Sequence, residues 1–206
     1  YGVRYYNHHP QRQVEYFTLQ LADSRAVLQR ERQGTLLVDN ERKLDMYMRA
    51  LWRDPEQLIP YSLIFDELLK PQPYFDDLGI RLPDVYDDAH GVDGVNRYRA
   101  ALAHIAAHRR WGKSIIADNF SPFQRNAIEI LEDSRVEFLA MREYPGLREI
   151  FMALHPVPDE NAVDYEHESG IRHRLTMLSR AILDANHPYK NAHVVDCARR
   201  FHLVME

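Results

Sequence analysis

Cysteine is nearly absent from this sequence. Cys197 is the one cysteine among 206 residues, so the chain cannot form an intrachain disulfide or a zinc site built from several thiolates. A chain with so little cysteine is typical of a reducing compartment. We therefore expect a cytoplasmic protein that does not use cysteine clusters to bind metal.

Long hydrophobic runs are also missing. No apolar stretch approaches the roughly 18 residues that cross a bilayer, and the first residues, YGVRYYNHHPQRQ, lack the apolar region of a signal peptide. We expect no membrane insertion. Because the chain begins with Tyr1 instead of methionine, we interpret it as part of a longer protein.

The sequence has no excess of basic residues. Lys and Arg number 26 against 31 Asp and Glu, which gives a formal net charge of −5. Nucleic-acid-binding domains usually carry a basic surface, so we expect no nucleic-acid partner. The motifs GxGxxG, GxxxxGK[ST] and GxSxG are absent as well, which argues against a dinucleotide site, a P-loop and a serine hydrolase.

Helical periodicity dominates what is present, so the sequence predicts an all-α, multi-helix domain. We expect a single helical domain over 1–206, with N-terminal helices in 1–70, a long loop at 71–93 and a helical core at 94–206. The individual helices are predicted at 11–33, 40–53 (Asn40 as N-cap), 61–70, 94–117, 122–143 (Ser121 as N-cap), 146–153, 168–185 and 191–203.

The segment PQPYFDDLGIRLPDVYDDAHGVDG, residues 71–94, differs in composition from its surroundings. It is rich in proline, glycine and aspartate, which is typical of loops, with a short extended piece possible at GIRLP. Its aspartates do not follow the ligand spacing of a calcium-binding EF-hand loop. We interpret them as residues of solvated turns.

Two histidines in ALAHIAAHRR, residues 101–110, are the first candidates for chemistry. His104 and His108 are four residues apart, so a helix would place both imidazoles on one half-buried face. This is the spacing of the HExxH zinc peptidases. Ile105, however, occupies the position where those enzymes carry the glutamate that acts as general base.

The helix predicted at 122–143 offers a carboxylate that could complete a metal site. Glu132 borders the apolar stripe, whereas Glu129, Asp133 and Glu137 fall on the opposite side, so Glu132 is the acid expected to point inward. His104, His108 and Glu132 would then form a two-histidine, one-carboxylate set for zinc.

A structural alternative remains open for the same residues. Arg135 falls within the apolar stripe, where a guanidinium needs an anionic partner, and Glu132 lies three residues before it on the same helix. In this interpretation Glu132 and Arg135 form a structural ion pair, and the two histidines are hydrogen-bonded core residues.

Several segments resemble a known family. LEDSRVEFLAMREYPGLREIF (131–151), RYRAALAHIAAH (97–108), IRLPDVYDD (80–88) and the later RHRLTMLSRAILDANHPYKNAHVVDCARRF are similar to the nitric oxide reductase activation proteins of the NorD type and the Rubisco-activation adaptors of the CbbO type. The resemblance covers about residues 60–203, and its most specific part is the EDxRVE stretch followed by PGLR.

The resemblance implies a function and a set of partners. Members of this family are bacterial adaptors that work with a hexameric MoxR-type AAA+ ATPase to activate or remodel a target metalloenzyme, and they typically end in a von Willebrand factor A domain. The DxSxS motif of that domain is absent here. The resemblance therefore implies the helical N-terminal region of an adaptor, a non-catalytic module. Its HxxxH and EDxRVE elements resemble a degenerate zincin scaffold, which keeps a metal-dependent hydrolase as the alternative function and zinc as a possible cofactor.

Overall fold

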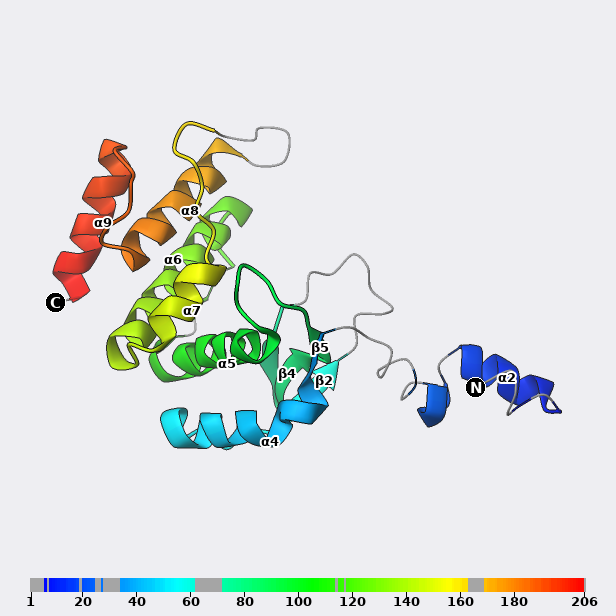
Figure 1. Ribbon diagram of the computed structural model, residues 1–206. Coiled ribbons are helices and arrows are strands. Elements are labelled where there is room, and N and C mark those ends of the chain that lie inside the picture. Colours follow the sequence, from blue (N-terminus) through cyan, green and yellow to red (C-terminus); the bar gives the residue numbers. More distant parts are fainter. Residues whose placement is uncertain are drawn as a thin grey trace.

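The described part of the chain is mostly helical (Figure 1). The computed structural model describes residues 6, 8–18, 20–24, 27, 34–61, 72–113, 115–116, 118–162 and 169–205. Its helices are α2 (Pro10–Phe17), α4 (Leu37–Tyr47), the π-helical turn η1 (Met48–Trp52), α5 (Gly94–Trp111), α6 (Pro122–Glu143), α7 (Leu147–Leu154), α8 (Gly170–Leu183) and α9 (Ala192–Met205).

Two small sheets correct the all-α prediction. The strands are β1 (Thr35–Leu36), β2 (Leu58–Tyr61), β3 (Tyr74–Asp76), β4 (Gly79–Pro83) and β5 (Val85–Tyr86). In one sheet β1 pairs antiparallel with β5; in the other, β4 lies between β2, which is parallel to it, and β3, which is antiparallel. The predicted loop at 71–93 thus contains three strands, and the predicted N-terminal helical region at 1–70 contains two.

Strand β4 includes the extended piece expected at GIRLP. Ile80 and Leu82 on one face of the strand are fully buried. On the other face Arg81 is partly exposed, whereas Gly79 and Pro83 are buried. The strand is only a few residues long, and it pairs with a segment that is distant in the sequence: Leu58 of β2 is the partner of Ile80. Pairing between distant short segments cannot be read from periodicity.

Helix α5 lies at the centre of the molecule (Figure 1). It contacts α4 on one side, α6 and α7 on another, and β1 and β5 near its start. Its apolar stripe includes Tyr98, Leu102 and Ile105, which are all buried. Asp93 forms the N-cap by accepting a hydrogen bond from the backbone N–H of Asn96 at 2.9 Å.

Helix α6 has the boundaries predicted from the sequence. Ser121 and Gln124 form a capping box, and Pro122 occupies the first helical position, where its missing N–H costs nothing. The helix contacts α5, α7 and α8. It is therefore buried on more than one side, and this decides which of its acids face the histidines.

Other helix boundaries differ from the predictions. Helix α4 begins at Leu37, and the Asn40 side chain donates to the carbonyl of Leu36 at 3.0 Å instead of capping the N-terminus. Helix α5 ends at Trp111, six residues early, with Gly112 at its C-cap. Helix α2 ends at Phe17, well before the expected 33, and the helix predicted at 61–70 falls almost wholly outside the described residues.

The C-terminal helices form a second packing unit. Helix α8 contacts α6 on one side and α9 on the other. Helix α9 buries Val194 and Ala198, whereas Val195 is exposed and Phe201 is partly buried. Among the described helices, none has both the length and the hydropathy needed to cross a membrane.

Candidate metal centre

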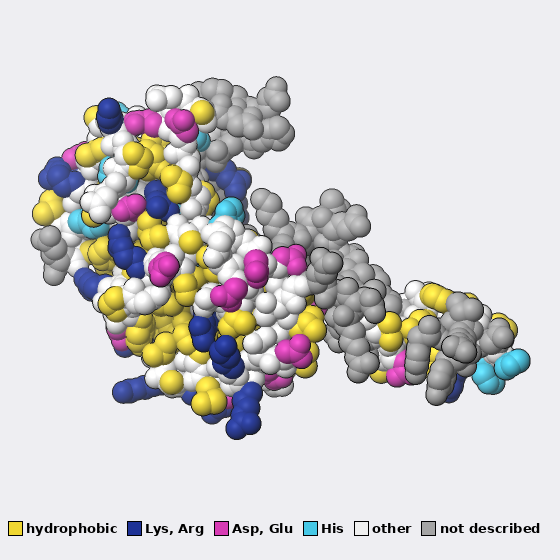
Figure 2. Space-filling view, in the orientation of Figure 1, with side chains coloured by type: hydrophobic (Ala, Val, Ile, Leu, Met, Phe, Trp, Pro, Cys, Tyr) yellow, Lys and Arg dark blue, Asp and Glu magenta, His cyan; other side chains and the backbone are white. Residues whose placement is uncertain are grey.

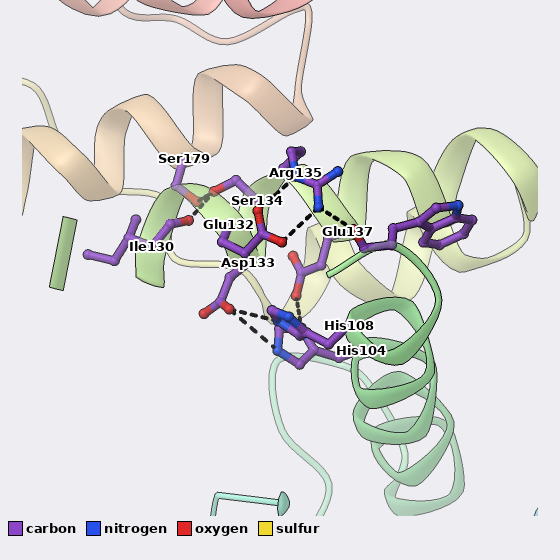
Figure 3. Close-up of polar contacts among 10 residues, drawn as sticks. His104, His108, Ile130, Glu132, Asp133, Ser134, Arg135, Glu137 and Ser179 are labelled. Atoms are coloured by element: carbon purple, nitrogen blue, oxygen red, sulfur yellow. Dashed lines mark hydrogen bonds and ion pairs between the residues drawn. The ribbon is translucent and has the colours of Figure 1, made fainter. Parts of the chain in front are cut away.

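The two histidines of α5 lie on one face of the helix, as their spacing predicts. Their ring centroids are 4.7 Å apart and the planes are inclined at 66°. Both side chains are partly buried, which confirms the half-buried position expected for them. They point from α5 toward the neighbouring α6 (Figure 3).

The acids that meet these histidines are Asp133 and Glu137, one helical turn apart on α6 (Figure 3). An oxygen of Asp133 lies 2.9 Å from Nε2 of His108 and 3.8 Å from Nε2 of His104. Glu137 Oε1 lies 2.9 Å from Nδ1 of His104. The sequence predicted these two acids on the opposite side of α6, and that prediction is wrong.

Glu132 takes the structural role that the sequence left open. Arg135 donates to both of its carboxylate oxygens at 2.7 Å, and the same guanidinium donates to the backbone carbonyl of Trp111 at 2.7 Å. Because Arg135 occupies both oxygens of Glu132, the structure does not bring Glu132 together with His104 and His108. Asp133 takes its place beside them.

A small-residue contact between α6 and α8 accounts for this orientation of α6. Ser134 is buried, and its hydroxyl contacts the carbonyl of Ile130 at 2.6 Å and the hydroxyl of Ser179 on α8 at 2.7 Å. Because serine counts as a polar residue in a hydrophobic pattern, the face of α6 that packs on α8 cannot be recognised from hydrophobic periodicity. With Ser134 on α8, the neighbouring Asp133 is directed to α5.

A cavity of about 600 Å³ opens beside His104. Its walls include charged side chains and histidines from several elements, namely His90, Arg97, His104, Glu129, Asp133, Glu137 and His155. Ile105 also lines it and is 5% exposed. The position of the HExxH general base is thus an aliphatic side chain that cannot accept a proton.

The acids change the protonation of His104. Burial by itself disfavours the imidazolium, but the hydrogen bond and charge of Glu137, together with the charge of Asp133, outweigh it and raise the pKa of His104 above its usual value. Burial alone would predict the opposite direction for a core histidine. The two nearby carboxylates, of Glu137 and Asp133, are the reason that the pKa of His104 is raised instead of lowered.

His155 is a site residue that the sequence did not reveal. It follows the end of α7; its Nδ1 donates to the carbonyl of Pro156 and its Nε2 accepts from the hydroxyl of Ser179, both at 2.8 Å. Burial lowers the pKa of His155, more than its contact with the Pro156 carbonyl raises it. Ser179 does not line the cavity, so this pair connects α7 to α8 and is no exposed nucleophile. No spacing or motif marks it in the sequence.

His104 and His155 should make the stability of the protein depend on pH in opposite directions. A raised pKa means that His104 adds stability that is complete below about pH 6.5 and is lost as pH rises through its folded-state pKa. The lowered pKa of His155 adds stability that is present above about pH 6.5 and is lost as pH falls. The stability difference between wild type and His104→Gln should therefore grow from pH 7.5 to 5.5, and that for His155→Gln should shrink.

Urea unfolding of the three proteins at both pH values measures these differences, in buffer containing a chelator so that metal does not contribute. Subtracting each variant from wild type removes the contribution of the other histidines. Differences that change in the same direction for both variants would contradict the assigned contacts.

Other side chains that could bind a metal lie elsewhere. His8 and His9 are exposed at the start of α2, where Figure 2 shows histidine side chains on the surface, and Cys197 is exposed on α9. Aspartates of the 71–94 segment act in turns and caps; Asp88, for example, accepts from the Gly94 N–H at 3.0 Å. Across the described residues, the group with metal-ligand geometry is His104, His108 and Asp133.

Comparison with known proteins yields no match: no protein-family model fits the chain, and no characterised protein or solved structure is significantly similar to it. The resemblance to the activation proteins consequently stays a prediction from the quoted motifs.

Proposed function

We propose that this chain is a non-catalytic adaptor module that works with a hexameric MoxR-type AAA+ ATPase to activate or remodel a metalloenzyme, of the kind represented by nitric oxide reductase or Rubisco. One observation carries the proposal. The buried Ile105 occupies the position where HExxH enzymes carry their catalytic glutamate, and it lies within segments that resemble the adaptor family. Because no glutamate directly follows His104 in the sequence, the helix lacks the base that HExxH enzymes use to activate metal-bound water, and this favours a binding role over hydrolysis.

Four residues of the motif stretches, Glu132, Arg135, Val136 and Leu147, have structural tasks, which also supports a scaffold. In EDxRVE, Glu132 and Arg135 form the ion pair that reaches the end of α5, and Val136 is fully buried in the core. In PGLR, Leu147 begins α7 and is buried. Motif residues that build helix contacts maintain a surface for a partner and need no substrate of their own.

Partner binding is the direct test of this proposal. The purified chain is mixed with the MoxR-type ATPase from the same genome, without nucleotide, with ADP and with a non-hydrolysable ATP analogue. We expect co-elution in at least one nucleotide state and a change of at least about twofold in ATPase turnover, with an unrelated AAA+ hexamer as the control. Absence of binding in all three states, together with unchanged turnover, would refute the adaptor function.

The alternative function is a zincin-type metal-dependent hydrolase. It is favoured by one observation: Asp133 contacts both His104 and His108, and His104 and Asp133 line a cavity. An unstructured protein substrate such as casein, incubated with the zinc-loaded chain, should remain intact if the adaptor proposal holds, because Ile105 cannot activate water. Chelator-sensitive cleavage that disappears in His104→Ala would favour the hydrolase instead.

A further inference from the structure

We infer that His104, His108 and Asp133 bind one divalent transition-metal ion of the zinc type, and that Glu137 is the positioning residue that orients His104 toward it. Metal binding at this site is independent of the adaptor function proposed above, and either can hold without the other.

The distances among the three side chains suit a single ion. In a tetrahedral zinc site with bonds of about 2.0–2.1 Å, ligand atoms lie about 3.3 Å apart. Asp133 Oδ1 is 2.9 Å from Nε2 of His108 and 3.8 Å from Nε2 of His104, and one ligand atom from each residue can be chosen so that all three lie within 4.8 Å of one another. Small side-chain rotations would bring all three onto one metal.

Glu137 supplies an independent indication of metal binding. Its Oε1 is 2.9 Å from Nδ1 of His104, whereas Asp133 lies 3.8 Å from the other ring nitrogen, Nε2. An imidazole that donates its Nδ1 proton to Glu137 keeps the lone pair of Nε2, the nitrogen nearer to Asp133, free to bind a metal (Figure 3). This carboxylate–histidine arrangement is the one that orients and strengthens histidine ligands in metal sites.

The donor set selects the class of metal. Two imidazoles and one carboxylate favour zinc and neighbouring first-row ions, whereas magnesium and calcium prefer ligand sets made of oxygen alone. Three protein ligands leave a fourth position for water or an incoming group. His104 and Asp133 line the cavity, so that position would be open to small molecules. His108 and Asp133 come from different helices, and a metal would therefore connect α5 to α6.

The same contacts could exist without metal, with protonated histidines paired to the two acids. The two states have a similar balance of charge, so charge alone does not distinguish them. Substitution of single residues does, because only the metal site has an affinity for zinc that a substitution can lower. A metal site loses its ion when one ligand atom is removed, and the adjacent Glu132 provides a control carboxylate on the same helix turn.

The experiment is a zinc titration of the chelator-treated chain by calorimetry, with competition by a chromogenic chelator. We expect about one zinc per chain for wild type. Asp133→Asn should lower the affinity by at least about 100-fold, and Glu137→Gln by about 10–100-fold, the usual effect of an orienting outer group. Glu132→Gln should leave the affinity within about threefold of wild type, because Arg135 holds that carboxylate away from the site.

Two further comparisons make the result decisive. The His104→Ala/His108→Ala variant should lose zinc, whereas the matched surface variant His8→Ala/His9→Ala should retain it. Zinc should also raise the melting temperature of wild type and not that of Asp133→Asn, because binding to the folded state alone stabilises it. Circular dichroism verifies that each variant is folded.

Three outcomes would overturn the inference: no zinc bound by the wild type, zinc retained by Asp133→Asn, or zinc lost in the His8/His9 variant. The first would identify the cluster as an ion-pair network between α5 and α6. The last would assign binding to the exposed N-terminal histidines.

Discussion

Replacing Tyr98 with alanine is expected to destabilise the protein by about 3–5 kcal/mol, the cost of deleting a large buried aromatic side chain. Tyr98 is 0% exposed and lies near the start of α5. Its ring packs on Tyr86 with centroids 4.6 Å apart, and its hydroxyl donates to the carbonyl of Pro83 at 2.8 Å. One side chain thus joins the central helix to both small sheets.

The variant Tyr98→Phe separates packing from hydrogen bonding. It keeps the ring but leaves the buried carbonyl of Pro83 without this donor, so we expect a loss of about 1–2 kcal/mol. Urea unfolding of wild type and both variants measures the two contributions. A loss below about 1 kcal/mol for Tyr98→Ala would mean that α5 does not pack on β4 and β5 as described.

Breaking the ion pair of Arg135 has the second-largest expected effect on the free energy of unfolding. Replacement by methionine leaves the Glu132 carboxylate, whose side chain is 24% exposed, without its cation. It also removes a donor from the Trp111 carbonyl, one of the terminal carbonyls of α5 that no residue of the helix can satisfy. Removing one partner of a buried pair costs about 3–5 kcal/mol, and partial exposure reduces the expected loss here to about 2 kcal/mol.

A double-mutant cycle identifies the source of that loss. Glu132→Gln alone should cost about 1 kcal/mol, since a neutral amide oxygen still accepts from Arg135. The double variant Glu132→Gln/Arg135→Met should be more stable than the sum of the single losses predicts, because it contains no unpaired charge. Strictly additive losses in thermal or urea unfolding would show that the two side chains do not interact.

Local sequence signals predicted the helices most accurately where capping residues mark the ends. Ser121, Pro122 and Gln124 define the start of α6, and the predicted and observed boundaries of that helix coincide. Helix α5 was extended too far at its C-terminus because the apolar residues after Gly112 continue the pattern. The strands were mostly missed because they are short and pair with distant segments, so their stability comes from partners that periodicity does not contain.

The proposed adaptor function rests on the sequence more than on the fold. The resemblance to the activation proteins comes from quoted motifs, and the fold adds that motif residues such as Val136 and Leu147 are buried parts of a scaffold. The metal site rests on the structure, because its third ligand is an acid that the sequence placed on the wrong side of α6.

The sequence by itself determined that His104 and His108 share a face, because a spacing of four residues is a local property of any α-helix. It also determined that Glu132 can reach Arg135, three positions along the same helix. Only the tertiary structure decided which acid meets the histidines. Neighbouring residues on a helix point about 100° apart, so the rotation of α6 about its axis selects Asp133 over Glu132. That rotation is set by the simultaneous packing of α6 against α5 and α8. It depends on contacts with two other helices, so it cannot be predicted from the sequence of α6 alone.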